Sequence, residues 1–449
     1  MFIIKREAFK ISGKSFKLPH RKDAAEVRTK KIATPKIVII STAQGIGVPC
    51  TPVVEVGDNV KTGQLIADSE AFISAPVYSS VTGKVSDIKD IEDISGRFNK
   101  AIVIESESQQ VMCETIAPPV IENRADFIKA VRKSGLVGLG GAGFPAHVKI
   151  GFDPEKFKVD TLLINGAECE PYVATDSCEF MENAENIIKG IKLIMKYCEI
   201  PRAIIGIEKK NPKAIRLMRE LIEKDADNYP DSPQANITVK RLGITYPQGA
   251  EKVLIYSAVG RVVREGQLPL AAGCLIVNVS SAAFIAKYVE TGIPLIYRRV
   301  TIDGNIVNKP ANLLMPIGTT LGDIISQADL RLRPDRIIFG GPMMGRSVYD
   351  MDTPISKTTG AVLFFKGFPN EKITVCIRCG KCVRACFMKL LPTEIENAYK
   401  ARDTKQLMKL NINSCMECGS CSYICPAKRN LAETNKLAKD LIRKSKSET

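Results

Sequence analysis

Short apolar runs separated by turn residues mark the first part of the chain. The runs cover residues 38–40, 51–54, 64–66, 76–78 and 83–85. Gly, Pro and an Asp-Asn pair lie between them, which is typical of the short strands of a small β-sandwich. The pattern predicts a β domain over residues 35–115. The basic, weakly patterned residues 1–34 are expected to form an extended arm.

From residue 119 onward, some segments have helical spacing and others are strand-length apolar runs. Phe127, Ile128 and Val131 predict a helix over residues 124–134. Further helices are expected over residues 184–198 and 213–224. Strands are expected to end at residue 165 and to cover residues 203–207, 237–239 and 275–279. Strands that alternate with helices indicate an α/β domain. It is expected over residues 119–290.

A β-rich segment and a cysteine-rich helical segment complete the chain. Residues 297–302 predict a strand before an Asp303-Gly304 turn, and a short helix is expected after Thr320. The expected boundaries are residues 291–350 for the β-rich module, 366–435 for the cysteine-rich domain and 436–449 for a basic tail.

Length and composition limit the class of protein. A chain of 449 residues exceeds one ordinary hydrophobic core, so several domains are expected. No apolar stretch approaches the roughly 18 residues that span a bilayer, and the N-terminus lacks the apolar centre of a signal peptide. We therefore expect a soluble, cytoplasmic protein with no transmembrane segment. The net charge of +15 indicates an acidic partner. Trp and aromatic-interleaved basic strands are absent, so nucleic acid is not expected.

Eight of the fourteen cysteines fall into two groups with the spacing C-x2-C-x2-C-x3-C. Three thiolates on such a tight loop reach three irons of a [4Fe–4S] cluster. A third cysteine so placed has no use in a tetrahedral zinc site. In two-cluster ferredoxins the last cysteine of each group binds the other cluster. The predicted ligand sets are Cys376, Cys379, Cys382 and Cys425 for one cluster, and Cys415, Cys418, Cys421 and Cys386 for the other.

The two cysteine groups differ in the residue that follows them. Pro426 follows the second group, whereas Phe387 follows the first, so a looser turn is expected at Phe387. Residues 392–409 between the groups have a helical composition, and the domain resembles a helical two-cluster ferredoxin. The other six cysteines are expected to be buried apolar residues, namely Cys50, Cys113, Cys169, Cys178, Cys198 and Cys274.

Residues 138–145 form a glycine-rich segment that contains the pattern G-x-G-x-x-G. A dinucleotide-binding fingerprint follows a strand and opens a helix. This segment instead follows a predicted helix and is interrupted by Pro145. Its free N–H groups and missing β-carbons suit a flat ligand or a phosphate, which Lys149 is near enough in sequence to meet.

Residues 138–149 resemble the glycine-rich loop of the flavin subunit of respiratory complex I, which binds FMN and receives hydride from NADH. Three further segments match that family in order, at residues 165–171, 246–252 and 278–280. The resemblance implies FMN contacts from Gly138, Gly140, Lys149, Asn165, Glu168 and Asn278. It implies NAD(H) contacts from Phe144, Glu170 and Glu251. Ala167 replaces an aspartate common in that family, and residues 264–269 lack the lysine and phenylalanine that clamp adenine there.

The order of the parts narrows the family further. Residues 56–64 and 81–85 resemble the barrel-sandwich hybrid of biotinyl and lipoyl carriers. Residues 69–72 lie where the modified lysine would be, so this copy is expected to be structural. The complex I-like α/β flavin domain, a β-grasp (SLBB-like) module and the helical two-cluster domain follow. This multidomain α/β plus β order resembles the C subunit of the Rnf ion-translocating ferredoxin:NAD+ oxidoreductase.

The resemblance implies an electron-transfer subunit that passes electrons between NAD(H), FMN and two [4Fe–4S] clusters. It also implies peripheral attachment to the cytoplasmic side of the cell membrane, and partner subunits that include a ferredoxin-like iron–sulfur protein. No nucleophilic pair of side chains is apparent, so no catalytic residue is predicted. Two alternatives stay open: a soluble reductase similar to cob(II)alamin reductases, and a non-catalytic iron–sulfur scaffold with an empty flavin fold.

Overall fold

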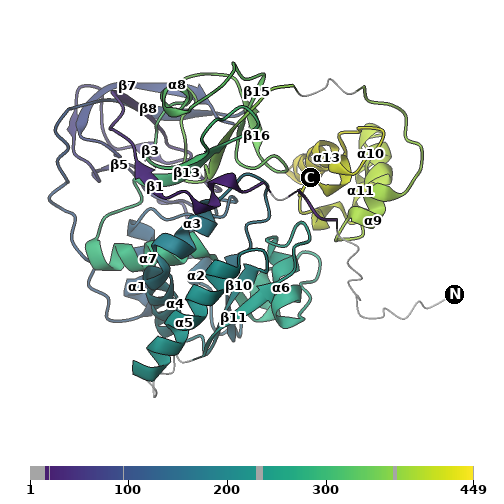
Figure 1. Ribbon diagram of the computed structural model, residues 1–449, viewed down its shortest axis with the longest axis horizontal. Coiled ribbons are helices and arrows are strands. Elements are labelled where there is room, and N and C mark those ends of the chain that lie inside the picture. Colours follow the sequence, from purple (N-terminus) through teal and green to yellow (C-terminus); the bar gives the residue numbers. More distant parts are fainter. Residues whose placement is uncertain (1–15, 20, 95, 229–235, 368–371, 448–449) are drawn as a thin grey trace.

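The computed structural model describes residues 16–19, 21–94, 96–228, 236–367 and 372–447. Two β-rich parts lie together above an α/β part, and the helical cysteine module lies to one side (Figure 1). A segment near the N-terminus runs between these parts (Figure 1). Residues 1–15 of the predicted arm fall outside the described residues.

The first β-rich part consists of two small antiparallel sheets. One sheet has the order β2 (Ile37–Ser41), β8 (Phe98–Ser106), β7 (Gly83–Glu92) and β4 (Asn59–Val60), and the other has β3 (Thr51–Pro52), β5 (Leu65–Asp68) and β6 (Val77–Tyr78). Alternating residues such as Val38, Ile40 and Ile102 form the buried core between them. The Arg132 guanidinium fixes one tip of this part to the α/β part, because it donates to Asp68 and to the Ser69 carbonyl.

The α/β part has a parallel sheet with helices on its two faces. The strand order is β11 (Ile237–Leu242), β10 (Ala203–Glu208), β9 (Thr161–Gly166) and β12 (Cys274–Asn278). Leu162 and Ile164 of β9 point to one hydrophobic cluster, and Leu163 between them points to another on the opposite face. The first cluster packs under α4 (Ala184–Cys198), α5 (Pro212–Asn228) and α7 (Val279–Thr291), and the second under α6 (Glu251–Val259).

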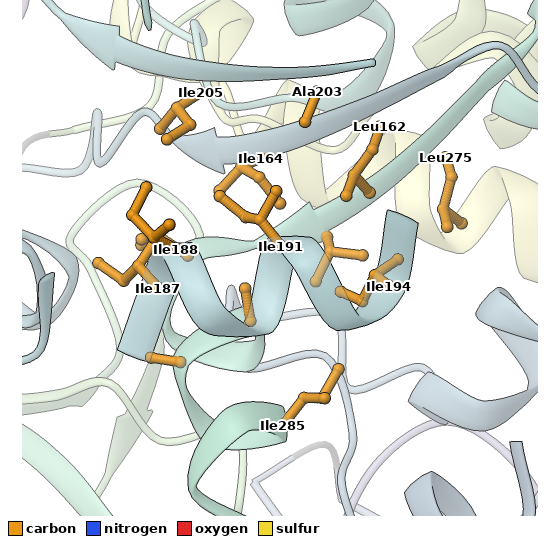
Figure 2. Close-up of a cluster of buried hydrophobic side chains, with 14 of the residues drawn as sticks. Leu162, Ile164, Ile187, Ile188, Ile191, Ile194, Ala203, Ile205, Leu275 and Ile285 are labelled. Carbon is orange, nitrogen blue, oxygen red and sulfur yellow. The ribbon is translucent and has the colours of Figure 1, made fainter. Parts of the chain in front are cut away.

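Helix α4 shows why the sequence forms this layer. Ile187, Ile191 and Ile194 recur at helical spacing and point toward the sheet, where they meet Leu162 and Ile164 (Figure 2). Fully burying each such side chain contributes roughly 1.5–3 kcal/mol. The smaller helices are α1 (Arg124–Lys133), α2 (Ala146–Ile150), α3 (Thr175–Glu182) and the 3-10 turn η3 (Pro269–Ala272).

The second β-rich part is a six-stranded mixed sheet. Its order is β1 (Thr29–Lys31), β14 (Ala311–Pro316), β13 (Tyr297–Asp303), β17 (Ala361–Phe365), β15 (Arg336–Phe339) and β16 (Arg346–Val348). Helix α8 (Leu321–Gln327) covers it and begins at Thr320, whose hydroxyl accepts from the Asp323 N–H. The sheet continues beyond the expected boundary at residue 350, because the wholly buried β17 is one of its central strands.

The predicted arm is not extended throughout its described part. Residues 23–26 form the 3-10 turn η1 (Asp23–Glu26), and β1 pairs in parallel with β14 at the edge of the six-stranded sheet. The Thr29 N–H donates to the Glu182 carboxylate of the α/β part. The Lys31 ammonium lies over the Tyr297 ring of the six-stranded sheet. The segment thus ties two parts of the molecule together.

The cysteine module is a small helical bundle. It contains α9 (Lys381–Ala385), α10 (Pro392–Lys400), α11 (Thr404–Lys409), η4 (Ile412–Ser414), α12 (Ser420–Tyr423) and α13 (Leu431–Ser447). The prediction of a separate basic tail from residue 436 was wrong, because Ala438 and Ile442 of α13 are buried against Ile395 and Leu407. Among the described residues, no helix combines the length and the apolar character needed to cross a membrane.

Candidate flavin site and cysteine module

The candidate flavin site lies at the carboxyl ends of β9 and β12. Asn165 is the next-to-last residue of β9 and Asn278 is the last residue of β12, and the two are register partners in the sheet. The chain runs outward from β9 through β10 to β11 on one side, and β12 lies on the other side. Parallel sheets bind ligands in the crevice at such a reversal of strand order, so the two asparagines occupy the position expected for a cofactor.

The glycine-rich loop lies against these two strand ends. Gly138 N–H donates to the Phe144 carbonyl over 2.8 Å, which closes the loop on itself. A β-carbon on Gly140 would lie 3.2 Å from the Asn278 amide nitrogen, whereas one on Gly141 would meet nothing within 4 Å. Gly141 has a φ of 115°. The loop thus offers exposed backbone beside Asn165 and Asn278, which is the surface that a flat ring needs.

Residues from two other parts of the molecule hold this loop. Arg298 of β13 is buried and donates to the Leu139 carbonyl over 2.7 Å and to the Thr359 carbonyl over 3.2 Å. Ile46 N–H of the first β-rich part donates to the Gly143 carbonyl over 2.9 Å. Gly143 has a φ of 65°, and a β-carbon there would lie 2.6 Å from the Thr358 side chain.

Sequence reasoning missed Arg298 and the Gly45-Ile46 contact. A buried arginine in a predicted strand has no local signature, since its two partners lie 159 and 61 residues away. The Gly45 and Gly47 pair was a usable signal, because two glycines between strands often mark a close backbone approach. A β-carbon on Gly45 would overlap the Gly143 carbonyl.

Glu168, predicted to contact FMN, already has protein partners. One carboxylate oxygen accepts from the Asp176 N–H over 2.9 Å, and the other accepts from the Ser177 hydroxyl over 2.9 Å. The buried Lys22 ammonium lies 3.2 Å from the same carboxylate. Glu168 therefore fixes the first turn of α3 and the N-terminal segment. Its direct contact with FMN stays a prediction.

Asp176 is a second carboxylate that the sequence did not reveal. It accepts from the Asn278 amide over 2.8 Å and from the Ser280 hydroxyl over 2.8 Å. Burial raises its pKa to about 7, and the nearby Glu168 carboxylate adds to the rise. Through Asn278, Asp176 orients the side chain that lies against Gly140.

Lys149 and Glu251 were predicted to meet FMN and the nucleotide ribose, and the structure brings them together. The Lys149 ammonium lies 2.5 Å from a Glu251 carboxylate oxygen, and the two side chains are partly exposed. Asn165 donates to the Gly249 carbonyl over 2.8 Å, so the loop before Glu251 also joins the site. The pair leaves a cation and an anion at the edge of the glycine-rich loop.

The Glu170 carboxylate contacts the loop between β15 and β16. Its Oε2 accepts from the Met343 N–H over 3.0 Å, and its buried Oε1 has no hydrogen-bond partner among the described residues. Burial raises the pKa of Glu170 to about 7. Phe144, the other predicted NAD contact, is half-buried where the glycine-rich loop closes. Neither Glu170 nor Phe144 is joined by a hydrogen bond to Glu251 in the described part of the chain.

The structure brings together the two predicted sets of cysteines. Burial raises the pKa of the Cys382 thiol, and the neighbouring Cys425 and Cys376 thiols raise it further. Burial likewise raises the pKa of Cys421 to about 12, and its neighbours Cys415, Cys418 and Cys386 add to the rise. Cys379 lies on the same loop as Cys376. Cys425 of the second group thus lies near Cys382 of the first, and Cys386 of the first group lies near Cys415, Cys418 and Cys421 of the second.

The two cysteine loops have the same backbone. Arg378 and Glu417 both take a left-handed φ, of 54° and 56°, and their N–H groups each lie 3.4 Å from the sulfur of the first cysteine of the group. Lys389 and Lys428 each have a φ of 53°. The expected looser turn at Phe387 was wrong, because the Lys389 N–H donates to the carbonyl of the last cysteine of its group as the Lys428 N–H does in the other.

The cysteine sets fit [4Fe–4S] clusters better than single ions. Over the described ranges, no three His, Cys, Asp or Glu side chains lie close enough to share one metal ion. A cubane binds its four thiolates at four separate irons, so its ligands are spaced more widely. Of the other six cysteines, Cys113 and Cys169 are only partly buried, which corrects the expectation that all six are buried.

The cysteine module contacts the α/β part through its second loop. The buried Tyr246 hydroxyl donates to the Cys418 carbonyl over 2.7 Å. A β-carbon on Gly419 would lie 2.7 Å from the Met343 carbonyl, so the loop that binds Glu170 also touches the cysteine loop. Phe16 lies between Tyr246 and Tyr423, with ring centroids 5.9 and 5.2 Å away. The loop of Cys415 to Cys425 therefore faces the candidate flavin site.

Four family profiles match the chain, in the order that the sequence predicted. They are the RnfC barrel sandwich hybrid domain at residues 13–109, the Nuo51 FMN-binding domain at 131–287, the SLBB domain at 299–347 and the 4Fe-4S dicluster domain at 375–428. The predicted fold class is confirmed.

Curated relatives match most of the chain. The C subunit of the proton-translocating ferredoxin:NAD(+) oxidoreductase complex of Clostridium ljungdahlii is 41% identical over 80% of this chain and 78% of its own. The C subunit of the Na(+)-translocating complex of Acetobacterium woodii is 38% identical over 84% of each chain. A solved NAD+-reducing [NiFe]-hydrogenase shares the fold, with a TM-score of 0.53 and 19% identity over 72% of this chain and 61% of that one.

An FMN-binding α/β domain beside a dicluster domain defines a flavin and iron–sulfur electron-transfer protein. The identity and coverage of the relatives are more specific. The chain belongs to the family of C subunits of the Rnf-type ion-translocating ferredoxin:NAD+ oxidoreductase complexes.

Proposed function

We propose that this chain is the electron-transfer subunit of a membrane-bound, ion-translocating ferredoxin:NAD+ oxidoreductase. The observation that carries the proposal is the meeting of Gly140, Asn165 and Asn278 at the strand ends, beside a cysteine loop that Tyr246 and Met343 contact. FMN exchanges two electrons as hydride with NAD(H) and releases them singly, and [4Fe–4S] clusters carry single electrons.

The residues of the chain supply placement and electrostatics for this chemistry. The exposed backbone at Gly140 and Gly141 leaves room for a flat ring, and Asn165 and Asn278 present amides beside it. Lys149 offers a cation for the FMN phosphate, and Glu251 an acceptor for a ribose hydroxyl of NAD(H). The two sets of four cysteines would hold the clusters. Glu170, with a pKa raised to about 7 by burial, can hold a proton near the site.

We further propose that the chain binds peripherally at the cytoplasmic side of the cell membrane, through other subunits of the complex. The relatives named as C subunits of such complexes support this. NAD+ and NADH are available in the cytoplasm, and the net charge of +15 suits acidic partner surfaces.

A single-turnover experiment tests the proposal. The anaerobically reconstituted chain is reduced chemically, freed of reductant and mixed with NAD+. We expect NADH to form with two electrons and one proton taken up per molecule. A flavin-depleted sample, with its clusters intact, is expected to form none.

The outcomes separate the remaining functions. NADH formation that depends on FMN supports the proposal. Full cluster content with no FMN bound and no NADH formed contradicts it and favours the iron–sulfur scaffold. NADH formation by a chain that does not co-fractionate with membranes carrying its partner subunits contradicts the assignment to a membrane complex.

A further inference from the structure

The two cysteine loops have one backbone but opposite surroundings. Residues 376–389 and 415–428 share left-handed positions and N–H contacts to sulfur, and each residue of the first corresponds to the residue 39 positions later in the second, whereas just before them Ile412–Ser414 form η4 and residues 373–375 form no helical turn. In the second loop Ile412 is 0% exposed and Ser414 is 8% exposed. Their counterparts Ile373 and Val375 are 55% and 81% exposed. Among the described residues, the contacts that bury the second loop thus have no equivalent around the first.

The two loops also differ in charge. Residues 372–389 contain five Lys or Arg and no Asp or Glu, whereas residues 411–428 contain one Lys and one Glu. Lys372, Arg378 and Lys381 lie around the first cysteines and are exposed, as is Arg384, which donates to the Cys379 carbonyl over 3.0 Å. In the second loop the residues equivalent to the first three are Asn411, Glu417 and Ser420. The positive charge is therefore found on the exposed loop, and a cysteine loop does not need it to form.

The first loop combines an apolar centre, made of Ile373, Val375 and Ile377, with a cationic rim that flanks it in the sequence, made of Lys372, Arg378 and Lys381. Ile377 is 63% exposed and lies next to Cys376, which is itself exposed. Exposed apolar residues inside a ring of charged ones are typical of a site that binds another protein. A cationic rim attracts an acidic partner and raises the rate at which it associates.

We propose that Lys372, Ile373, Val375, Ile377, Arg378 and Lys381 form a docking face for an acidic iron–sulfur protein. We call this surface the Cys376 face. This inference rests on the proposed function, because a cluster beside the Cys376 face can pass electrons onward only if the second cysteine loop lies beside the flavin. The second loop already contacts the α/β part through Tyr246 and Met343. The residues of the Cys376 face are instead exposed over the part of the chain that the structure describes.

The chain itself supplies a conservative test. Lys372→Asn, Arg378→Glu and Lys381→Ser give the first loop the residues at the matching positions of the second loop, with a charge change of −4. Glu is compatible with the left-handed position, because Glu417 has a φ of 56°. A second variant, Val375→Ser, copies Ser414 and tests the apolar centre without a change in charge.

Binding is measured with the reconstituted full chain and a small acidic two-[4Fe–4S] ferredoxin, by calorimetry at several salt concentrations. We expect the triple variant to bind about tenfold or more weakly than the wild type, with a shallower salt dependence. Val375→Ser is expected to weaken binding by about threefold to tenfold with an unchanged salt dependence.

A matched control changes the same total charge on another surface. Lys189→Gln, Arg216→Glu and Lys224→Gln lie on exposed positions of α4 and α5. This variant is expected to bind the ferredoxin as the wild type does. Equal weakening by the control and the triple variant would mean that only net charge matters, and would overturn the docking face. So would a wild type that holds its cofactors but does not bind the ferredoxin.

The readouts keep this inference separate from the proposed function. Iron, sulfide and FMN are determined in every variant before binding is measured. A wild type that lacks FMN or clusters contradicts the proposed function and, with it, the docking face. A wild type that forms NADH in a single turnover, but loses no affinity in the triple variant, contradicts the docking face alone.

Discussion

The cysteine loops and the glycine-rich loop reach their geometry by different routes. Each cysteine loop has its own left-handed residues and its own N–H groups directed at sulfur. The fourth cysteine of each predicted ligand set comes from the other loop. The glycine-rich loop instead depends on Arg298 from the six-stranded sheet and on Ile46 from the first β-rich part.

This difference separates a site that is encoded locally from one that is assembled. A cysteine loop forms wherever its short segment folds, so a change elsewhere leaves it intact. The glycine-rich loop takes its shape only when three parts of the chain are packed together. Damage to the packing is therefore expected to remove FMN before it removes iron.

The largest effect is expected from Cys425→Ser. Loss of the crossing ligand removes one cluster, so iron falls from about eight to about four per chain, with FMN unchanged. Iron, sulfide and FMN analysis of the anaerobic protein measures this. Cys113→Ser, a change outside the two groups, serves as the control and is expected to keep all the iron. Loss of FMN together with the cluster would show that the two sites are not independent.

Arg298→Met tests the assembled site. The variant leaves the buried Leu139 and Thr359 carbonyls without their donor, at a cost of roughly 1–3 kcal/mol each. We expect FMN to bind at least tenfold more weakly while the iron content stays the same. Fluorescence titration with FMN measures the affinity.

The control for Arg298 is its neighbour on β13. Arg299 pairs with Glu179 and Glu182 and makes no hydrogen bond to the glycine-rich loop within the described residues. Arg299→Met is expected to lower stability without a selective loss of FMN. If both variants lost FMN equally, the contact between Arg298 and Leu139 would not be the cause.

Lys357→Met tests the junction of the three parts. The buried ammonium donates to the Pro76 and Gly135 carbonyls over 2.7 Å each, and Gln44 binds the Lys357 N–H. Burial lowers the pKa of Lys357 from 10.5 to about 7. The unfolded chain therefore holds a proton that the folded chain has lost between these values, and wild-type stability rises with pH from 7 to about 10.

In the variant this rise is expected to be absent. The loss of about 2 kcal/mol from the two unpaired carbonyls should be clearest at pH 9 and smaller at pH 7. Urea midpoints at the two pH values measure it. A wild type and a variant with parallel pH profiles would refute the role given to the lysine.

The smallest effect is expected from Glu170→Gln. Burial raises the pKa of Glu170 from 4.5 to about 7, so the folded chain holds a proton that the unfolded chain has lost in this window. Wild-type stability therefore falls as pH rises from about 5 to 7. In the variant, the decrease in the free energy of unfolding over this pH range should be smaller by roughly 1–2 kcal/mol. Thermal midpoints at pH 5.5 and 8 give the comparison, and an unchanged slope in the variant would contradict the assignment.

The local sequence pattern was enough to predict secondary-structure elements such as α4 and the grouping of the cysteines. Helix α4 begins and ends where the isoleucine spacing predicted, because its apolar face alone determines its position. The crossing of Cys386 and Cys425 follows from spacing, and the structure brings each to the other group.

Contacts between distant segments were not predictable in this way. Strand β1 was predicted as part of a basic arm, because its pairing with β14 needs only its backbone. The part of α13 from residue 436 onward was predicted as a basic tail, because an amphipathic pattern does not say what covers its apolar face. Arg298, Asp176 and Tyr246 were missed for the same reason: their partners come from other parts of the chain.

The most direct test is the cofactor content of the intact chain and of its Arg298→Met variant, prepared without oxygen. The account predicts about eight irons, about eight acid-labile sulfides and one FMN in the wild type, and the same iron and sulfide with little FMN in the variant. A wild type with full iron and no FMN, or a variant that loses iron and FMN in proportion, would contradict it.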